Sequence, residues 1–179
     1  MYLKPGYILV ILLFISFVSP PERFAWDEER PLRWSDFKGA PDYLLNFVAT
    51  TNSGMTQSYT IDGYGVLDKS SSTVMAHFYP TFSWYKPADT TAFILRHEQS
   101  HFDITEIHVR KLRKRIQEYS FTANSKEEIK QLYEITEQER RATQRLFDEE
   151  TDHSRIKGQE ILWQERIRDS LEKYWVFTP

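Results

Sequence analysis

Two histidines and a glutamate, His97, Glu98 and His101, form an HExxH pattern near the middle of the chain. Residues four apart on a helix lie on one face about a turn apart, so the two imidazoles can bind a single metal ion. Glu98 is offset by roughly 100° around the helix, where its carboxylate can accept a proton from water instead of binding the metal. A catalytic zinc ion takes nitrogen and oxygen ligands and keeps one position for water, whose pKa it lowers to about 7. The pattern therefore predicts a zinc hydrolase in which Glu98 is the general base.

Any short motif also arises by chance, so the residues around the histidines matter. Apolar residues recur at helical spacing on both sides of the pattern, at residues 92–95 before it and at Phe102, Ile104, Ile107 and Val109 after it. This context is typical of a ligand-bearing helix that is buried in a core. The alternative is a non-catalytic envelope protein, in which the same residues bind a structural metal or pack a helical core and the sheet binds a partner.

A catalytic zinc site needs a third protein ligand, and the residues alone leave several candidates. His108 lies on the same helical face as His101, but seven residues of unbroken helix put it roughly 10 Å further along the axis. We therefore expect His108 beside the site, in the cleft or at the surface. His153 lies at the junction of two predicted helices, where a side chain can turn toward a cleft. The other candidates are acids before that junction: Glu134, Glu137, Glu139, Asp148, Glu149, Glu150 and Asp152.

Length and composition indicate one globular domain. The chain has 179 residues, of which 40% are hydrophobic and 15% aromatic, enough for one well-filled core and too few for two domains of ordinary size. The formal net charge of -3 gives no basic surface for nucleic acid, so we expect no nucleic-acid partner. The basic run at residues 110–115 is expected to pair with acids of the following helix.

The N-terminal residues have the composition of an export segment. Residues 7–18 are apolar apart from Ser16, which is the length of a signal-peptide core and short for a membrane span. No small-x-small cleavage triplet follows, so residues 1–21 are predicted to be a signal peptide or an N-terminal membrane anchor. The chain has no cysteine, which leaves neither disulfides nor a lipid-modified cysteine. We expect an exported protein that is periplasmic, extracellular or membrane-anchored facing outward.

Residues 22–179 are predicted to form one α+β domain, with a strand-rich half at residues 22–88 and a helical half at residues 89–179. Short runs rich in Val, Thr, Tyr and Ser predict a small antiparallel sheet, which a three-helix unit follows. The predicted strands span residues 48–51, 55–61, 65–69 and 72–79. The predicted helices span residues 90–119, 125–150 and 158–175, with Asp89 as the first N-cap and Ser125 with Glu128 as a capping box.

Several segments resemble a bacterial family, domain of unknown function 922, which is described as predicted secreted zinc-dependent proteases. The most specific is the histidine motif at residues 95–104, with Glu106 and Arg110 after it. The likeness runs over most of the chain after the export segment, with Phe147 and Ser154 where the family usually has tyrosine and glycine. The other matching segments are residues 32–39, 83–84 and 147–153.

The resemblance implies a zincin-like metallopeptidase domain with Zn2+ as its cofactor. It also implies that His153 is the third metal ligand, with Asp148 as its rival or as a partner that orients a ligand. Glu98 keeps the catalytic role. By this resemblance, His97, Glu98 and His101 occupy the family's metalloprotease positions. Asp148, Thr151 and His153 match its recurring aspartate, threonine and histidine.

The resulting hypothesis is that a zinc-activated water hydrolyses a peptide or protein substrate. The protein is also expected to associate with a membrane through its N-terminal segment. An extended substrate is expected to pair with an exposed strand edge, for which residues 72–79 are the candidate. Tyr79, Tyr85 and His108 are the candidates for stabilising an oxyanion.

Four other residues of the matching segments receive structural roles. Asp103 is about 200° around the helix from His101 and so faces away from the metal. We expect Asp103 and Glu106 to form salt bridges with a neighbouring helix. Trp34 and Trp84 are expected in the core or in the cleft wall.

Overall fold

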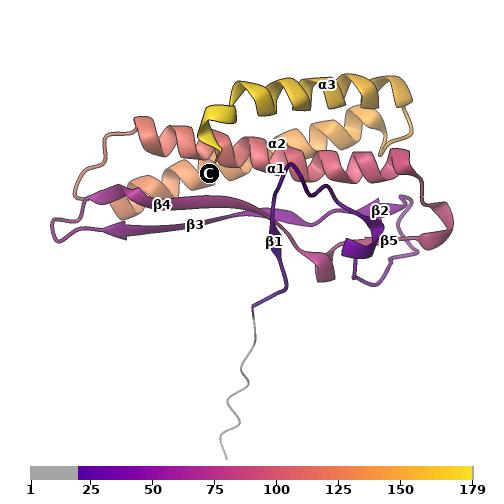
Figure 1. Ribbon diagram of the computed structural model, residues 1–179, viewed down its shortest axis with the longest axis horizontal. Coiled ribbons are helices and arrows are strands. Elements are labelled where there is room, and N and C mark those ends of the chain that lie inside the picture. The colour runs from indigo at the N-terminus through magenta and orange to yellow at the C-terminus, as the bar shows by residue number, and fades with distance from the viewer. Residues whose placement is uncertain (1–19, 179) are drawn as a thin grey trace, which may run out of the picture.

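Two antiparallel sheets and three long helices make up the protein in the computed structural model, which describes residues 20–178. The apolar run at residues 7–18, predicted to be a signal or anchor, lies outside the described residues. Figure 1 shows three layers, with the larger sheet first, then α1 (Ala92–Glu118) and α2 (Ser125–Thr151), and then α3 (Lys157–Lys173) farthest from the sheet. The predicted α+β class, with a small antiparallel sheet followed by three helices, is confirmed.

The larger sheet is a long hairpin with one short added strand, in the order β1-β4-β3. β3 (Ser53–Ile61) pairs along its length with β4 (Leu67–Phe78). β1 (Phe24–Ala25) pairs with the last two residues of β4. The chain reverses between β3 and β4 at Gly65, whose φ of 84° is in the left-handed region and where an added Cβ would lie 2.7 Å from the carbonyl oxygen of Ala123. A glycine is therefore required at this turn.

The strands expected at residues 65–69 and 72–79 are one continuous strand, β4. The polar residues between them suggest a turn, but the pairing continues past them with a register shift between Ser58 and Thr60 of β3. An irregularity of this kind accommodates the extra residues of β4 without ending the strand. The prediction of two strands here is therefore wrong.

A second, two-stranded sheet lies beside the first and consists of β2 (Ala49–Thr50) and β5 (Trp84–Tyr85). β2 is the strand expected at residues 48–51. β5 and β1 were not among the expected strands, because a two-residue strand is too short for the alternation that identifies strands in a sequence.

The first helix begins within two residues of the predicted start, but its cap differs. Thr91 is the N-cap of α1, and its Oγ1 accepts a hydrogen bond from the amide of Ile94 at 3.1 Å. Asp89, the expected cap, belongs to a 3-10 helix, Pro87–Asp89, and cannot reach those amides. The cap is thus two residues later than predicted.

The predicted capping box at the start of α2 is also wrong. Asn124 is the N-cap residue, and Ser125 turns into the fold, where its Oγ accepts a hydrogen bond from the amide of Leu67 at 2.8 Å. Glu128 accepts hydrogen bonds from the amide and the hydroxyl of Thr122, at 2.9 and 2.6 Å. Both side chains satisfy groups outside the helix, because the loop that precedes α2 packs back on the β3–β4 turn.

The sheet covers one side of α1, and residues of α2 and α3 cover another, so both of these sides are buried. One side packs on the sheet in a core that includes Phe78, Phe102 and Leu112, each 0–1% exposed. The other side packs on α2 and α3. This second cluster consists of Ile104, Ile107, Phe147, Trp163 and Ile167.

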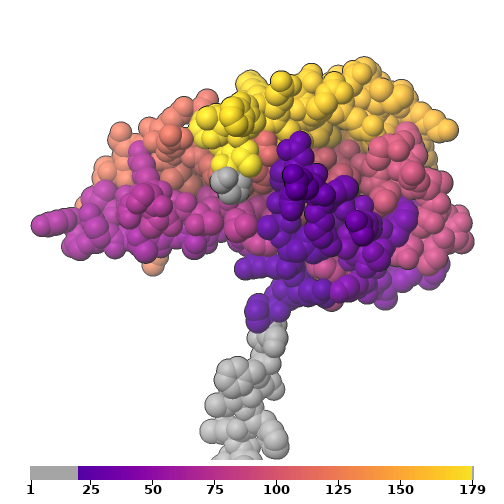
Figure 2. Space-filling view, in the orientation of Figure 1, coloured from indigo at the N-terminus to yellow at the C-terminus, as the bar shows by residue number. Residues whose placement is uncertain are grey.

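The N-terminal residues from position 20 onward cross one face of the molecule, in indigo in Figure 2, and reach α1 beneath α3. Trp26 is the main contact, because its indole Nε1 donates a hydrogen bond to Asp103 Oδ1 at 2.7 Å. Short 3-10 helices complete the fold, at Trp34–Asp36, Pro80–Phe82, Pro87–Asp89 and Trp175–Phe177. Among the described residues, no helix has the length and apolar character to cross a membrane.

The turn that joins α2 to α3 has a strained backbone. Asp152, His153 and Ser154 have φ values of 46°, 50° and 70°, all in the left-handed region. Residues with a Cβ are about 1–2 kcal/mol less stable there than in the right-handed region. A glycine, which the resemblance leads us to expect at position 154, would adopt this φ without strain.

We expect Ser154→Gly to raise the free energy of unfolding by about 0.5–1 kcal/mol, because relief of strain exceeds the added freedom of the unfolded chain. Urea denaturation followed by circular dichroism measures this change. Ser58→Gly, in the exposed part of β3, is the control and should lower stability by about 0.5–1 kcal/mol. A loss of stability in Ser154→Gly would contradict the strain at this turn.

Candidate metal centre

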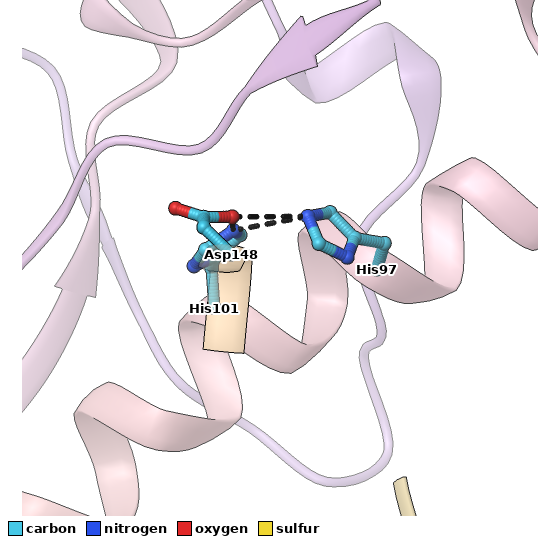
Figure 3. A group of neighbouring side chains, drawn as sticks. All are labelled: His97, His101 and Asp148. Atoms are coloured by element: carbon cyan, nitrogen blue, oxygen red, sulfur yellow. Dashed lines mark hydrogen bonds and ion pairs between the residues drawn. The ribbon is translucent and has the colours of Figure 1, made fainter. Parts of the chain in front are cut away.

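Three side chains from two helices converge on one point: His97 and His101 from α1 and Asp148 from α2 (Figure 3). The Nε2 atoms of the two histidines are 3.2 Å apart, and Asp148 Oδ1 lies 3.3 Å from His97 Nε2 and 3.0 Å from His101 Nε2. Ligand atoms at about 2.0–2.1 Å from a tetrahedral zinc ion are roughly 3.3 Å from one another. The three atoms therefore have the mutual spacing of ligands around one metal ion.

The chemistry of these atoms also fits a cation. Asp148 Oδ1 is buried and, although two imidazole nitrogens are near it, has no hydrogen-bond partner among the described residues. A buried carboxylate oxygen without a hydrogen bond destabilises a fold, and a divalent cation would satisfy it. Two imidazoles and one carboxylate form a donor set that suits Zn2+. His97, His101 and Asp148 are thus a candidate metal site.

The outer ring nitrogens are held by two residues that the sequence did not suggest. His97 Nδ1 donates a hydrogen bond to Glu160 Oε2 at 2.9 Å, and His101 Nδ1 donates one to the side-chain carbonyl of Gln144. Gln144 Nε2 in turn donates to the backbone carbonyl of His101 at 2.8 Å. Hydrogen bonds at Nδ1 fix the ring orientation and leave Nε2 as the ligand atom. Both histidines are thereby presented to the same point.

Glu160 is completely buried, at 0% exposure, on the face of α3 that packs against α1. It shares that face with Trp163 and Ile167, three and seven residues later, so a carboxylate interrupts an apolar helical stripe. An ionisable residue in such a stripe is the one sequence signal that could have identified Glu160. Gln144 has no comparable signal, because it lies on a helix with polar residues on most turns.

The acids around His97 favour a positive charge at this place. Burial lowers the pKa of His97, but the neighbouring carboxylates of Asp148, Glu160 and Glu98 outweigh it and raise the pKa to about 9. Burial acts to raise the pKa of Asp148, but the imidazoles of His101 and His97 hold it well below its usual range. The same charges that keep a proton on His97 would stabilise a divalent cation.

Glu98 lies beside this group without joining it. Glu98 is only 3% exposed, and its Oε2 is buried with no hydrogen-bond partner among the described residues. Glu98 also lines the cleft that opens at the metal site. The carboxylate is thus free to contact a water molecule or a substrate there.

A cleft of about 390 Å³ opens at the three donors. α1 and α2 form two of its walls, and the segment that contains β2, residues 47–53, forms the third. From α1 and α2 the lining residues are Ile94, His97, Glu98, His101, Arg140, Arg141, Gln144, Arg145 and Asp148, followed by His153 and Ser154 of the turn.

His153, the predicted third ligand, borders this cleft but lies outside the group of three. Its Nδ1 is 3.4 Å from Asp148 Oδ1, and its ring stacks on Phe47 with the centroids 5.2 Å apart. Asp148, its rival in the sequence analysis, is the carboxylate that meets both histidines. The role of His153 as a ligand stays a prediction.

His108 lies neither at the surface nor in the cleft. It is 1% exposed within α1, and its Nδ1 donates a hydrogen bond to the carbonyl oxygen of Ile104 at 2.8 Å. Burial lowers its pKa to about 4, so it is a neutral core residue. Tyr79 and Tyr85, the other candidates for stabilising an oxyanion, are likewise absent from the cleft lining.

The strand edge expected to bind a substrate is already occupied. β1 pairs with β4 at Phe78 and His77, and the amide of Trp26 donates to the carbonyl oxygen of Ala76 at 3.0 Å. Arg113 donates to the carbonyl oxygen of Val74 at 2.6 and 2.9 Å. The prediction of a free edge along residues 72–79 is wrong, because the N-terminal residues pair with residues 76–78 and Arg113 binds the carbonyl oxygen of Val74.

The acids that follow the motif also differ in their partners. Asp103 Oδ1 accepts hydrogen bonds from Trp26 Nε1 and Gln99 Nε2, both at 2.7 Å, and its carboxylate forms no salt bridge with the other described residues. Glu106 pairs with Arg110 and Arg113 of its own helix, at 2.9 and 3.2 Å, rather than with a neighbouring helix.

Within the basic run, Arg115 pairs as expected with an acid of the next helix, Glu139 of α2, at 2.7 Å. The two tryptophans of the matching segments lie in the walls of the fold around the smaller sheet. Trp84 stacks on Phe47, and Trp34 packs on Tyr85.

Residues 81–154 match a protein-family model described as "Bacterial protein of unknown function (DUF922)". The chain contains a DUF922 domain. The DUF922 segment runs from just before β5 to the turn after α2 and includes all three residues of the metal group, together with Glu98 and His153. The family resemblance seen in the sequence is thereby confirmed, and the family description assigns no activity. No curated protein and no solved structure matches the chain.

Substitution of Asp148 and of His153 identifies the third ligand. We expect Asp148→Ala to weaken zinc binding by more than about a hundredfold, which exceeds the effect of losing a residue that only supports a ligand. His153→Ala should weaken it by less than about tenfold. Competition with a chromophoric chelator measures both affinities. The reverse order would make His153 the ligand and Asp148 its support.

Zinc affinity should also rise with pH, because the metal must displace the proton that His97 holds up to a pKa of about 9. We expect the apparent affinity to increase about tenfold per pH unit between pH 6 and pH 8. For the same reason the metal-free chain should lose stability as the pH rises from about 6.5 toward 9. A zinc affinity that does not change over this range would contradict the protonation of His97.

Proposed function

We propose that this DUF922 protein is an exported zinc-dependent metallopeptidase that hydrolyses peptide bonds, with Glu98 as general base. The observation that carries the proposal is the Glu98 carboxylate, which is buried next to the metal group, lines the cleft and has an oxygen without a partner. An acid with a purely structural role would have both oxygens paired, because an unpaired buried carboxylate is destabilising. Such a group is retained where chemistry requires it.

Each residue of the site has a role in this reaction. A bound zinc ion would lower the pKa of a water molecule and polarise the carbonyl of the scissile bond. His97, His101 and Asp148 would hold the ion, and Glu160 and Gln144 keep the two imidazoles oriented toward it. The carboxylate of Glu98 accepts a proton from the attacking water and returns it to the leaving amine.

The edge of β2 that faces away from β5 is consistent with a peptide substrate. The amide of Lys86 donates to Val48 O at 2.8 Å, and the amide of Tyr79 donates to Asn52 O at 3.0 Å. In an antiparallel pair alternate residues bond to the partner strand, so the backbone groups of Ala49 and Thr51 face the other way. Both of these residues line the cleft. An extended peptide could add to this edge as a further strand beside the metal.

The alternative is a structural metal site in a binding protein. A structural zinc site is closed by four protein ligands and has no room for water or substrate. The cleft of about 390 Å³ at the three donors favours the enzymatic interpretation. A zincin-like arrangement, in which a helix carries the ligands and a strand edge carries the substrate, is part of the proposal.

Export is supported by composition. Residues 1–21 have the apolar core of a signal peptide or an anchor, and the chain has no cysteine that an oxidising compartment would pair. We propose that the protein works in the periplasm, outside the cell, or at the membrane surface facing outward. Its partners are peptide or protein substrates, with membrane contact through the N-terminal segment.

Glu98→Gln keeps the shape of the side chain and removes its basicity. We expect this variant to retain zinc and to lose peptide hydrolysis by about 10²–10⁴-fold in kcat. Metal analysis and a library of fluorogenic peptides measure the two properties. Glu149→Gln, an exposed position on α2 without an ion pair among the described residues, is the matched control and should keep full activity. A zinc-loaded parent protein that cleaves no peptide would refute the proposed function.

A further inference from the structure

The wall of the cleft that α2 forms is basic. Arg140, Arg141 and Arg145 line it, on the same side of the helix as Gln144 and Asp148. The chain as a whole has a net charge of -3, so its average composition does not explain three arginines at one cleft. The opposite wall, residues 47–53, contains no charged side chain that could neutralise them.

Two of these arginines already share an acid. The Glu137 carboxylate accepts hydrogen bonds from Arg140 Nε and Nη2 and from Arg141 Nε, each at 2.7 Å. Burial alone would raise the pKa of Glu137, but the hydrogen bonds from Arg140 and Arg141 outweigh it and keep the pKa below its usual value. One ionised carboxylate thus offsets part of the charge and fixes Arg140, which is 9% exposed, in the floor of the cleft.

Arg145 differs from the other two. Its guanidinium forms no hydrogen bond and no ion pair with any residue between positions 20 and 178. It lies three residues before Asp148 on α2, a rise of about 4.5 Å along the helix axis. Arg141 lies about 10 Å before Asp148 on the same helix. A free planar cation that borders the cleft one turn from the metal group is suited to bind a carboxylate.

We propose that Arg145, assisted by Arg141, binds an acidic side chain of the substrate, so that the site prefers acidic peptides. This specificity rests on the proposed function. The charge left after pairing with Glu137 is small, which suits one or two carboxylates better than the many phosphates of a nucleic acid. A carboxylate at the C-terminus of a substrate has the same chemistry and is distinguished by the test below.

The direction in which residues 47–55 run determines on which side of the cleaved bond the acidic residue of the substrate lies. Tyr133 of α2 donates to Met55 O at 2.9 Å, whereas His153 stacks on Phe47, so residues 47–55 run antiparallel to α2. A peptide that pairs antiparallel with β2 therefore runs in the direction of α2 and passes Arg141 and Arg145 before the metal group. With about 3.3 Å per extended residue, the acidic side chain lies one to three residues before the cleaved bond.

Pairs of peptides that differ only by Glu or Gln at each of these positions test the proposal. Both ends of every peptide are blocked, by acetylation and amidation, so that no terminal carboxylate is present. We expect kcat/KM to be at least about tenfold higher for the Glu member of one pair, and Arg145→Glu to abolish or invert that ratio. Arg145→Gln should abolish it without inversion, which guards against misfolding of the charge-reversed variant.

Arg168→Glu is the matched control, because Arg168 is exposed on α3, outside this cleft, and within residues 20–178 pairs only with its neighbour Asp169 at 3.5 Å. It should leave the Glu-to-Gln ratio unchanged. Equal cleavage of both members by the parent protein, or a ratio that Arg145→Glu does not alter, would overturn the proposal. A preference that appears only when the C-terminus is unblocked would assign Arg145 to a terminal carboxylate and also overturn it.

A second readout separates this proposal from the proposed function. Zinc-loaded Glu98→Gln protein is titrated with the fluorescein-labelled Glu and Gln peptides, and binding is followed by anisotropy. Tighter binding of the Glu peptide, lost in the double variant with Arg145→Glu, would support acidic specificity even if the parent protein cleaves nothing. Equal binding of the two peptides, or an Arg145-dependent affinity only for a single-stranded oligonucleotide, would exclude it.

Discussion

The burial of α1 on both sides is the constraint on which the rest of the structure depends. This helix lies between the sheet and α3, yet it carries His97, Glu98 and Arg110, which are all about 3% exposed. Buried polar groups must find partners. Glu160 of α3 provides one for His97, and Arg110 donates to the carbonyl oxygen of Leu171 at 2.7 Å. α3 thus both covers the helix and satisfies its polar groups.

The same packing fixes the metal group before any ion binds. Phe147 lies against both rings, with centroids 4.5 Å from His97 and 5.0 Å from His101. It is 0% exposed in the cluster between the three helices. One residue later on α2, Asp148 is placed at the two Nε2 atoms. Rings held by an aromatic contact and by hydrogen bonds at Nδ1 lose little further freedom when they bind a metal, which favours binding.

Local sequence signals predicted the α+β class, the three long helices and a common site for His97, Glu98 and His101. Each of these depends on the spacing of residues within one element. Signals of the same kind failed at β1, β5 and the N-caps. Thr91 is the cap in place of Asp89 because Asp89 belongs to a 3-10 helix, and Asn124 is the cap in place of Ser125 because Ser125 bonds the distant amide of Leu67. The free strand edge was misassigned for the same reason, since β1 comes from the other end of the sequence.

By itself, the sequence determined which helix could hold a metal and which of its residues could act on water. The tertiary structure alone decided which carboxylate meets the two histidines, that Glu160 and Gln144 orient them, and that an arginine with no partner in the described part of the chain borders the cleft. The physical reason is distance along the chain: Glu160 lies 63 residues from His97, and Gln144 lies 43 from His101. Helical periodicity relates residues within a few turns, whereas contacts between helices depend on how their buried faces pack.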